Sequence, residues 1–178
     1  MVNDDVLKGK KILIVDDEID VLELLEDLLD ECDTKTASTF EEAKTLLEQN
    51  PYDVAILDIM GVKGLDLLEV ATEKKIPALM LTARGLNPDN LMESIQRGAK
   101  ACVPKEKMSE IDIYLKEIFI AKNEGVEKSG NWFARLGSLF EKRFGVGWRN
   151  KEKEFWDDFD KNYKVSDEEL KKIKHWVG

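Results

Sequence analysis

Four short apolar segments in the first 105 residues each lead into a side chain that could handle phosphate or a metal ion. The segments are residues 11–15, 54–57, 78–81 and 101–104. The residues that follow or end them are Asp16, Asp17, Asp58, Thr82 and Lys105. If the segments are neighbouring parallel strands, these side chains meet in the crevice beyond the carboxyl ends of the strands, where open α/β sheets bind ligands.

The chemistry of these groups points to phosphoryl transfer. Three carboxylates in one crevice raise one another's pKa by mutual repulsion unless a cation neutralises them. Magnesium suits such a site, because it prefers oxygen ligands and is usually held by one or two carboxylates together with phosphate oxygens. A carboxylate beside the ion can act as a nucleophile toward phosphorus. Thr82 and Lys105 supply a hydroxyl and an ammonium to compensate charge on the phosphoryl oxygens.

The pattern between these residues predicts the fold that would position them. Five short strand patterns alternate with helical patterns, joined by connections of a few residues. This predicts an α/β fold with a doubly wound five-stranded parallel sheet and helices on both faces. A flavodoxin-like strand order of 2-1-3-4-5 would bring together the ends of strands 1, 3, 4 and 5.

The expected elements have recognisable boundaries. A first helix should end near Asp33 and Thr34, followed by a short strand at residues 36–37; a second helix should be capped near residues 38–39 and stopped at Pro51. The last helix of this part, from about Ser109 to Lys122, is apolar around most of its circumference. Since an exposed helix needs a polar outer face, we expect the C-terminal extension or another copy of the chain to cover its second stripe.

The set of motifs resembles the receiver domain of two-component response regulators over residues 10 to about 122. The motifs are residues 14–18 (Ile-Val-Asp-Asp-Glu), 57–60 (Leu-Asp-Ile-Met), 81–84 (Leu-Thr-Ala-Arg) and 98–99 (Gly-Ala), with Lys105. Each motif alone is weak, but four in order at receiver spacing are specific.

The resemblance implies a role for each residue. Asp58 would be the phosphoacceptor, supplied by a histidine kinase or phosphotransfer protein, so the chain would take part in its own phosphorylation and dephosphorylation without being an enzyme. Asp17 and Asp58 would ligate Mg²⁺ with the main-chain carbonyl of Met60, and Asp16 would act through water. Thr82 would report phosphorylation and Lys105 would pair with the phosphoryl group. Arg84 and the Met60 side chain would either face the phosphoryl group or lie solvated in their loops.

Three departures from the family pattern limit what the resemblance implies. The loop after Asp58, residues 59–64, is about two residues shorter than usual and lacks a proline. Cys102 stands where the family usually has an aromatic switch residue, and Glu106 where a proline commonly follows the lysine.

Composition separates the chain into two regions, which we predict to be a receiver domain at residues 1–124 and a helical extension at residues 125–178. Residues 1–124 hold 27 acidic and 15 basic side chains, whereas residues 125–178 hold 10 and 12 together with all four tryptophans. The acidic body should repel nucleic acid.

No long apolar stretch is present and the N-terminus is acidic, so we expect no membrane insertion and a cytoplasmic protein. Cys32 and Cys102 lack metal-ligand spacing, and His175 is distant; we expect both thiols to be buried and His175 to be a surface residue.

The extension has aromatic residues at helical spacing on either side of residues 145–147, and a third helix that should begin at Ser166 and include Ile173 and Val177. Three short helices do not easily bury that many rings, so we expect them to pack on the body, a partner or a second subunit.

The favoured interpretation of the extension is a protein-interaction or dimerisation module that passes the signal to an unknown downstream protein. The alternative is a degenerate helix-turn-helix in a DNA-binding transcriptional regulator, which the interleaved acidic residues disfavour. Their mixed charge also disfavours docking on a membrane surface.

Overall fold

The computed structural model describes residues 6–84 and 86–171. The chain divides into two compact units, residues 1–119 and 120–178, which we call the sheet unit and the tail unit. The division falls inside helix α5, which spans Ile111–Asn123. The domain boundary that the sequence predicts, after residue 124, lies just beyond the same helix.

The sheet unit contains five strands, and every neighbouring pair is parallel. The strands are β1 (Lys11–Val15), β2 (Asp33–Ala37), β3 (Val54–Asp58), β4 (Ala78–Thr82) and β5 (Ala101–Pro104). Their order is β2-β1-β3-β4-β5, as the sequence predicts. The chain therefore has the flavodoxin-like arrangement, in which β1, β3, β4 and β5 lie side by side.

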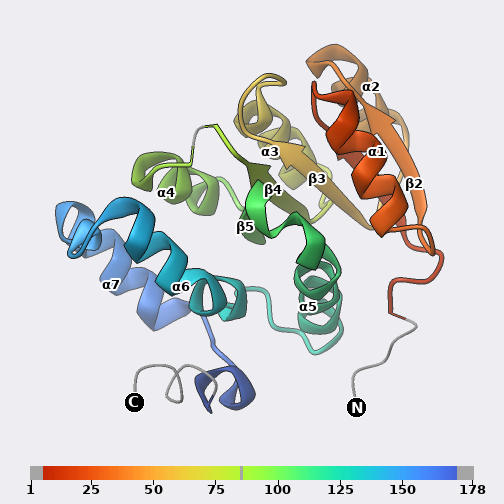
Figure 1. The fold of residues 1–178 in the computed structure, drawn as a ribbon. Helices are drawn as coiled ribbons and strands as arrows, with labels where there is room; N and C mark the ends of the chain where they lie inside the picture. The colour runs from red at the N-terminus through yellow and green to blue at the C-terminus, as the bar shows by residue number, and fades with distance from the viewer. Residues whose placement is uncertain (1–5, 85, 172–178) are drawn as a thin grey trace. The chain divides into compact units, whose positions relative to one another are not determined.

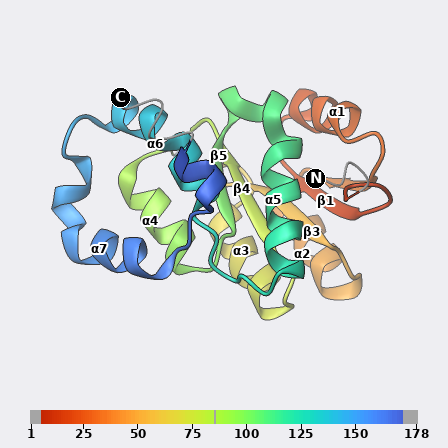
Figure 2. The same ribbon diagram turned by 90° about the horizontal axis from the view of Figure 1, so that it is seen from below.

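Helices cover both faces of the sheet (Figures 1 and 2). They are α1 (Ile19–Leu28), α2 (Phe40–Gln49), α3 (Gly64–Glu73), α4 (Pro88–Gln96) and α5. The connection through α1 leads from β1 to the β2 edge of the sheet, and the next three connections lead toward the β5 edge. Because such β–α–β connections are right-handed, α1 lies on the opposite face of the sheet from α2, α3 and α4. In agreement, α3 contacts both α2 and α4.

The predicted start of α2 is confirmed, and α4 has a cap of the same kind. The Thr39 hydroxyl accepts a hydrogen bond from the Glu42 main-chain N–H at the start of α2. The Asn87 side chain does the same for Asn90 at the start of α4, which begins with Pro88. The glycine after α4, Gly98, has a φ of +102°, a conformation that a residue without a side chain adopts at low cost.

The start of β2, the start of α5 and the burial of one cysteine differ from the sequence-based expectation. Asp33 and Thr34 belong to β2, because they pair with Lys11 and Ile12 of β1. The segment before α5 is a separate 3₁₀ turn, η1 (Lys105–Glu110), which delays the helix to Ile111. Cys102 is fully buried, and burial raises the pKa of its thiol to about 12, but Cys32 is only half-buried. The expectation that a second element covers α5 stays a prediction.

The tail unit contains two long helices and a 3₁₀ turn whose aromatic rings pack on one another. The elements are α6 (Asn131–Phe144), η2 (Trp148–Glu152) and α7 (Lys153–Asn162). Phe133 lies at the centre, with ring centroids of Trp156 and Phe159 5.2 Å and 4.9 Å away. A second group joins Phe140, Phe144 and Trp148. The rings thus find partners inside the unit to a greater extent than the sequence suggested.

The end of the described chain is fastened to α6 by polar contacts. The Ser166 hydroxyl accepts from the Glu169 main-chain N–H, which confirms the predicted cap, and residues 167–171 are helical. Glu169 is buried and forms an ion pair of 3.0 Å with Arg135. Ile173, His175 and Val177 lie outside the described residues. Within residues 6–84 and 86–171, no helix is long and apolar enough to span a membrane.

Two glycine-to-alanine substitutions should change stability in opposite directions. A Cβ at Gly64 would lie 1.9 Å from the main-chain oxygen of Asp58, whereas a Cβ at Gly137, inside α6, meets nothing within 4 Å. We expect Gly64→Ala to lower the free energy of unfolding of the sheet unit by about 2 kcal/mol. Gly137→Ala should raise that of the tail unit by up to about 1 kcal/mol, because alanine is the better helix former.

Urea unfolding followed by circular dichroism and by tryptophan fluorescence would measure both effects, since every tryptophan lies after residue 125. Two changes of the same sign would contradict the packing described here.

Candidate functional site

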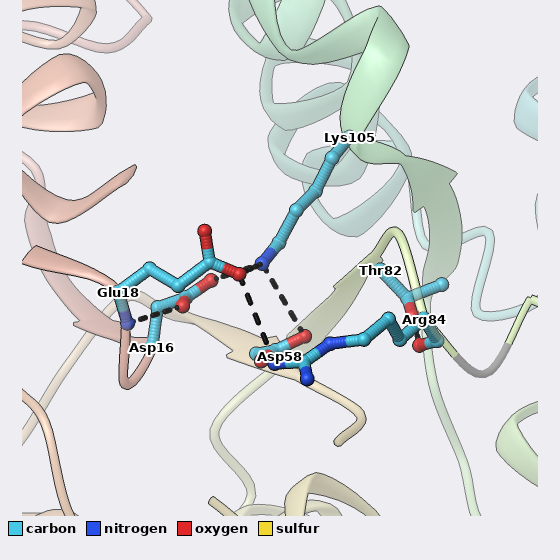
Figure 3. A network of polar contacts seen from close by, with 6 residues as sticks. All are labelled: Asp16, Glu18, Asp58, Thr82, Arg84 and Lys105. Atoms are coloured by element: carbon cyan, nitrogen blue, oxygen red, sulfur yellow. Dashed lines mark hydrogen bonds and ion pairs between the residues drawn. The ribbon is translucent and has the colours of Figure 1, made fainter. Parts of the chain in front are cut away.

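The five residues singled out in the sequence all lie at the carboxyl edge of the sheet. Asp16 and Lys105 directly follow β1 and β5, while Asp58 and Thr82 are the last residues of β3 and β4. The register sets Asp58 beside Leu81 and Thr82 beside Pro104, so the strands end almost level. Figure 3 shows the resulting cluster of polar side chains.

The ammonium of Lys105 joins the carboxylates of the cluster. Its Nζ lies 2.8 Å from Oδ2 of Asp16 and 3.7 Å from Oδ1 of Asp58. Asp16 and Asp58 are almost completely buried, with 1% and 3% of their surfaces exposed. Lys105 therefore provides the positive charge that lets two carboxylates share a buried crevice.

Asp16 also fixes the start of the loop that follows β1. Its Oδ1 accepts a hydrogen bond of 2.9 Å from the Glu18 main-chain N–H. The two oxygens of one carboxylate thus face different partners, Lys105 on one side and the loop on the other. This arrangement holds the side chain in one orientation at the base of the site.

Glu18 is a member of the site that sequence reasoning missed as a functional residue. Its Oε1 lies 3.5 Å from Lys105 Nζ and 4.0 Å from a guanidinium nitrogen of Arg84. Figure 3 shows Glu18 between the two cations. The signal was present in the sequence, because Glu18 continues the acidic run that follows β1, but a run of charges usually marks a solvated loop.

Thr82 is completely buried and its hydroxyl donates to the main-chain oxygen of Arg84. The hydroxyl therefore bonds to its own β4–α4 loop, at the edge of the cluster in Figure 3. Arg84 itself is mostly exposed, with 70% of its side chain accessible. Met60 is also exposed, at 48%.

Asp17 is exposed at the mouth of the site. Its carboxylate lies against Gly61, where a Cβ would come within 2.7 Å of both carboxylate oxygens. Gly61 has a φ of +84°. A glycine here lets the β3–α3 loop approach the carboxylate closely, which no larger residue could do without displacing Asp17.

The side-chain oxygens of these residues are suitable ligands for a magnesium ion. One carboxylate oxygen from each of Asp16, Asp17 and Glu18 lies within 4.8 Å of the others. Hard oxygen ligands of this kind are the ones that magnesium prefers. The cluster adds Glu18 to the expected ligands, whereas Asp58 is engaged by Lys105.

The electrostatics of the crevice show an excess of negative charge. Burial and, next, the Asp16 carboxylate raise the pKa of Asp58 to about 7, because Lys105 opposes them only in part. For Lys105, burial alone would lower the pKa, but the hydrogen bond to Asp16 and the nearby carboxylates raise it above its ordinary value. A further cation would therefore be stabilised here.

Comparison with known proteins places residues 12–116 of this chain in a known family. The family described as the response regulator receiver domain matches residues 12–116. The CpxR homolog of Haemophilus influenzae, a transcriptional regulatory protein, is 38% identical over 100 residues, which are 53% of this chain and 43% of that protein. The response regulator GtcR of Aneurinibacillus migulanus is 32% identical over 131 residues, 68% of this chain and 53% of that protein. The chain thus spans about half of the length of these relatives.

Solved structures agree in fold. A response regulator receiver domain protein from Clostridium thermocellum is 28% identical, with a TM-score of 0.57 over 64% of this chain and 97% of that chain. A receiver domain protein from Methanospirillum hungatei shares the fold at 23% identity, with a TM-score of 0.61 over 66% of this chain and 99% of that chain. Strand order, strand-end residues and family match all agree, and the chain belongs to the response regulator receiver domain family of two-component systems.

Proposed function

We propose that Asp58 accepts a phosphoryl group from a histidine kinase or phosphotransfer protein in a magnesium-dependent reaction. The observation that carries this proposal is the joint position of Asp58, Lys105 and the acidic cluster at the ends of parallel strands. Each residue alone has an ordinary structural role, but together they provide a nucleophile, a cation and a set of metal ligands.

In the proposed reaction, an Asp58 carboxylate oxygen attacks phosphorus and forms an aspartyl phosphate. The bond from phosphorus to the imidazole nitrogen of the donor breaks, and the nitrogen retains the electron pair. Asp16, Asp17 and Glu18 would hold the magnesium ion together with the expected ligands, Asp58 and the main-chain carbonyl of Met60. The ion supplies positive charge beside the phosphoryl oxygens when it is bound.

Lys105 would change partners in this reaction. In the structure its ammonium is nearer to Asp16 than to Asp58. A phosphoryl group on Asp58 adds negative charge on that side of Lys105, so the ammonium would move toward it. Because Lys105 lies at the junction of β5 and η1, this shift would reach the segment leading into α5.

The chain would act as a phosphoacceptor and not as an enzyme, since the group that reacts is its own side chain. We further propose that the tail unit is a protein-interaction module that responds to phosphorylation. Its aromatic rings form a connected cluster, and two of its arginines form ion pairs within the unit: Arg135 pairs with Glu169 and Arg149 with Asp160.

The DNA-binding alternative has less support from these residues. The relative from Haemophilus is named a transcriptional regulatory protein, but its alignment covers 100 residues and 43% of its length. Residues of α7 that face solvent include Glu154, Asp157 and Asp158. These acidic groups would oppose the approach of a phosphate backbone.

Phosphorylation of Asp58 can be tested directly. Incubation with Mg²⁺ and a small phosphodonor should add one phosphoryl group, measured by intact-protein mass spectrometry, and Asp58→Asn should abolish the addition. The control Asp20→Asn removes an exposed carboxylate from the nearby helix α1 and should leave the addition intact. Undiminished modification of Asp58→Asn would show that another residue is the acceptor.

Removing the ammonium should make stability depend more strongly on magnesium. Lys105→Gln leaves two buried carboxylates unpaired, and we expect the free energy of unfolding of the sheet unit to fall by about 3 kcal/mol without metal. Added Mg²⁺ should recover more stability in this variant than in the wild type.

Urea unfolding with and without Mg²⁺, followed by circular dichroism, measures this effect. Lys107→Gln is the control: its side chain is 42% exposed in an ion pair with Glu110, so its removal should cost less than about 1 kcal/mol. Equal effects of the two substitutions would argue against a central role for Lys105.

Coupling to the tail unit can be followed through its tryptophans. Beryllofluoride, a phosphoryl mimic, should change the tryptophan fluorescence saturably in the presence of Mg²⁺, and Asp58→Asn should remove the change. An unchanged spectrum, with binding shown on the same sample, would mean that the tail unit does not respond to the site.

A further inference from the structure

The outer stripe of α1 is acidic, with apolar side chains set among the charges. Asp20, Glu23 and Asp27 are exposed, as are Leu24 and Leu28, at 45% and 37%. Their spacing puts them on one face of the helix. Ile19, at the start of the helix, is 65% exposed. We call these six residues the acidic face.

The acidic face is not arranged to stabilise its own helix. No basic residue occurs between Lys11 and Lys35, and Asp20, Glu23 and Asp27 form no ion pair within the described part of the chain. Like charges three and four residues apart repel. Acidic residues near the end of α1 also oppose the helix dipole, and the last turn has no basic residue to offset them. A positively charged occupant would relieve both costs.

The tail unit contains a surface of opposite character at residues 142–153, which we call the basic tip. This segment has five basic residues and one acidic residue. Lys142, Lys151 and Lys153 are exposed and form no ion pair with any residue that the structure describes. Val146 lies between the segment's two glycines with 91% of its surface exposed. The basic tip therefore has an exposed apolar side chain within a mainly basic stretch of sequence.

We propose that the basic tip of one copy of the chain binds the acidic face of a second copy. The charges of the two surfaces are opposite, and each surface exposes aliphatic groups that association would remove from water. Two acidic faces repel each other, and so do two basic tips, so the contact joins unlike surfaces. If both pairs form reciprocally, the assembly is a closed dimer.

Other occupants of the basic tip fit the observations less well. An anionic membrane or a nucleic acid would match its charge, but either would be repelled by the acidic face and would leave it unoccupied. A second copy satisfies both surfaces with residues that the chain already contains. The proposal does not depend on phosphorylation of Asp58.

Sedimentation velocity of the full chain over a range of concentrations tests this proposal. We expect reversible self-association whose Kd rises at least about tenfold between ~50 mM and ~300 mM NaCl, because salt screens exposed charges. Glu23→Lys with Asp27→Lys, and separately Lys151→Glu with Lys153→Glu, should each weaken it at least about tenfold at low salt. Glu41→Lys with Glu48→Lys makes the same charge change on α2 and should leave it unchanged.

In an equimolar mixture of wild type and the variant with Glu23→Lys and Asp27→Lys, each mixed dimer has lost one of its two contacts. The mixture should therefore form fewer dimers than wild type alone. A chain that combines both double substitutions exchanges the charges and should recover association. Circular dichroism melts verify that each variant is folded. Wild type that stays monomeric at low salt, association unaffected by either double substitution, or failure of the combined variant to recover would each overturn the proposal.

Discussion

The ion pair between Lys105 and Asp16 is the interaction on which the site depends. Two carboxylates, of Asp16 and Asp58, are buried within a few ångströms of a single ammonium. Without that cation, burial and mutual repulsion would favour protonation of one carboxylate or separation of the strands that bring them there. Lys105 thus allows the crevice to form, and its separation of 3.7 Å from Asp58 leaves that carboxylate the less firmly bound of the two.

The parallel sheet provides the geometry that this ion pair requires. Side chains from β1, β3, β4 and β5 meet because the four strands run in one direction and end at nearly the same level. The close approach of Gly64 to the Asp58 carbonyl oxygen then fixes how the chain leaves β3. The same loop brings Gly61 against Asp17. Main-chain packing, more than side-chain contacts, therefore places the exposed carboxylate beside the buried ones.

The sequence was informative where a repeating pattern had a single interpretation. Apolar strands followed by Asp58, Thr82 and Lys105 predicted the strand order and the meeting of these residues, because parallel strands allow few alternatives. It failed where tertiary contacts decide. Pairing with β1 draws Asp33 into β2 despite its weak strand propensity. The direction of the Thr82 hydroxyl is set by a carbonyl of its own loop, which no spacing reveals.

In the tail unit, too, the sequence predicted the helices but not how their side chains pack, for a different reason. Helical spacing of aromatic residues predicted α6 and α7, but not that Phe133 would contact rings from both helices and from η2. Rings of this size can form a core with few neighbours, since each buries a large area. The large apolar side chains of α6, η2 and α7 are buried or half-buried, whereas Val146 and most of the charged groups are exposed. The charge is sorted along the chain, mostly basic at residues 142–153 and mostly acidic along α7. In the proposed association, charge sorted in this way would provide binding specificity without adding to the core, so that the surface of the tail unit would select its partner.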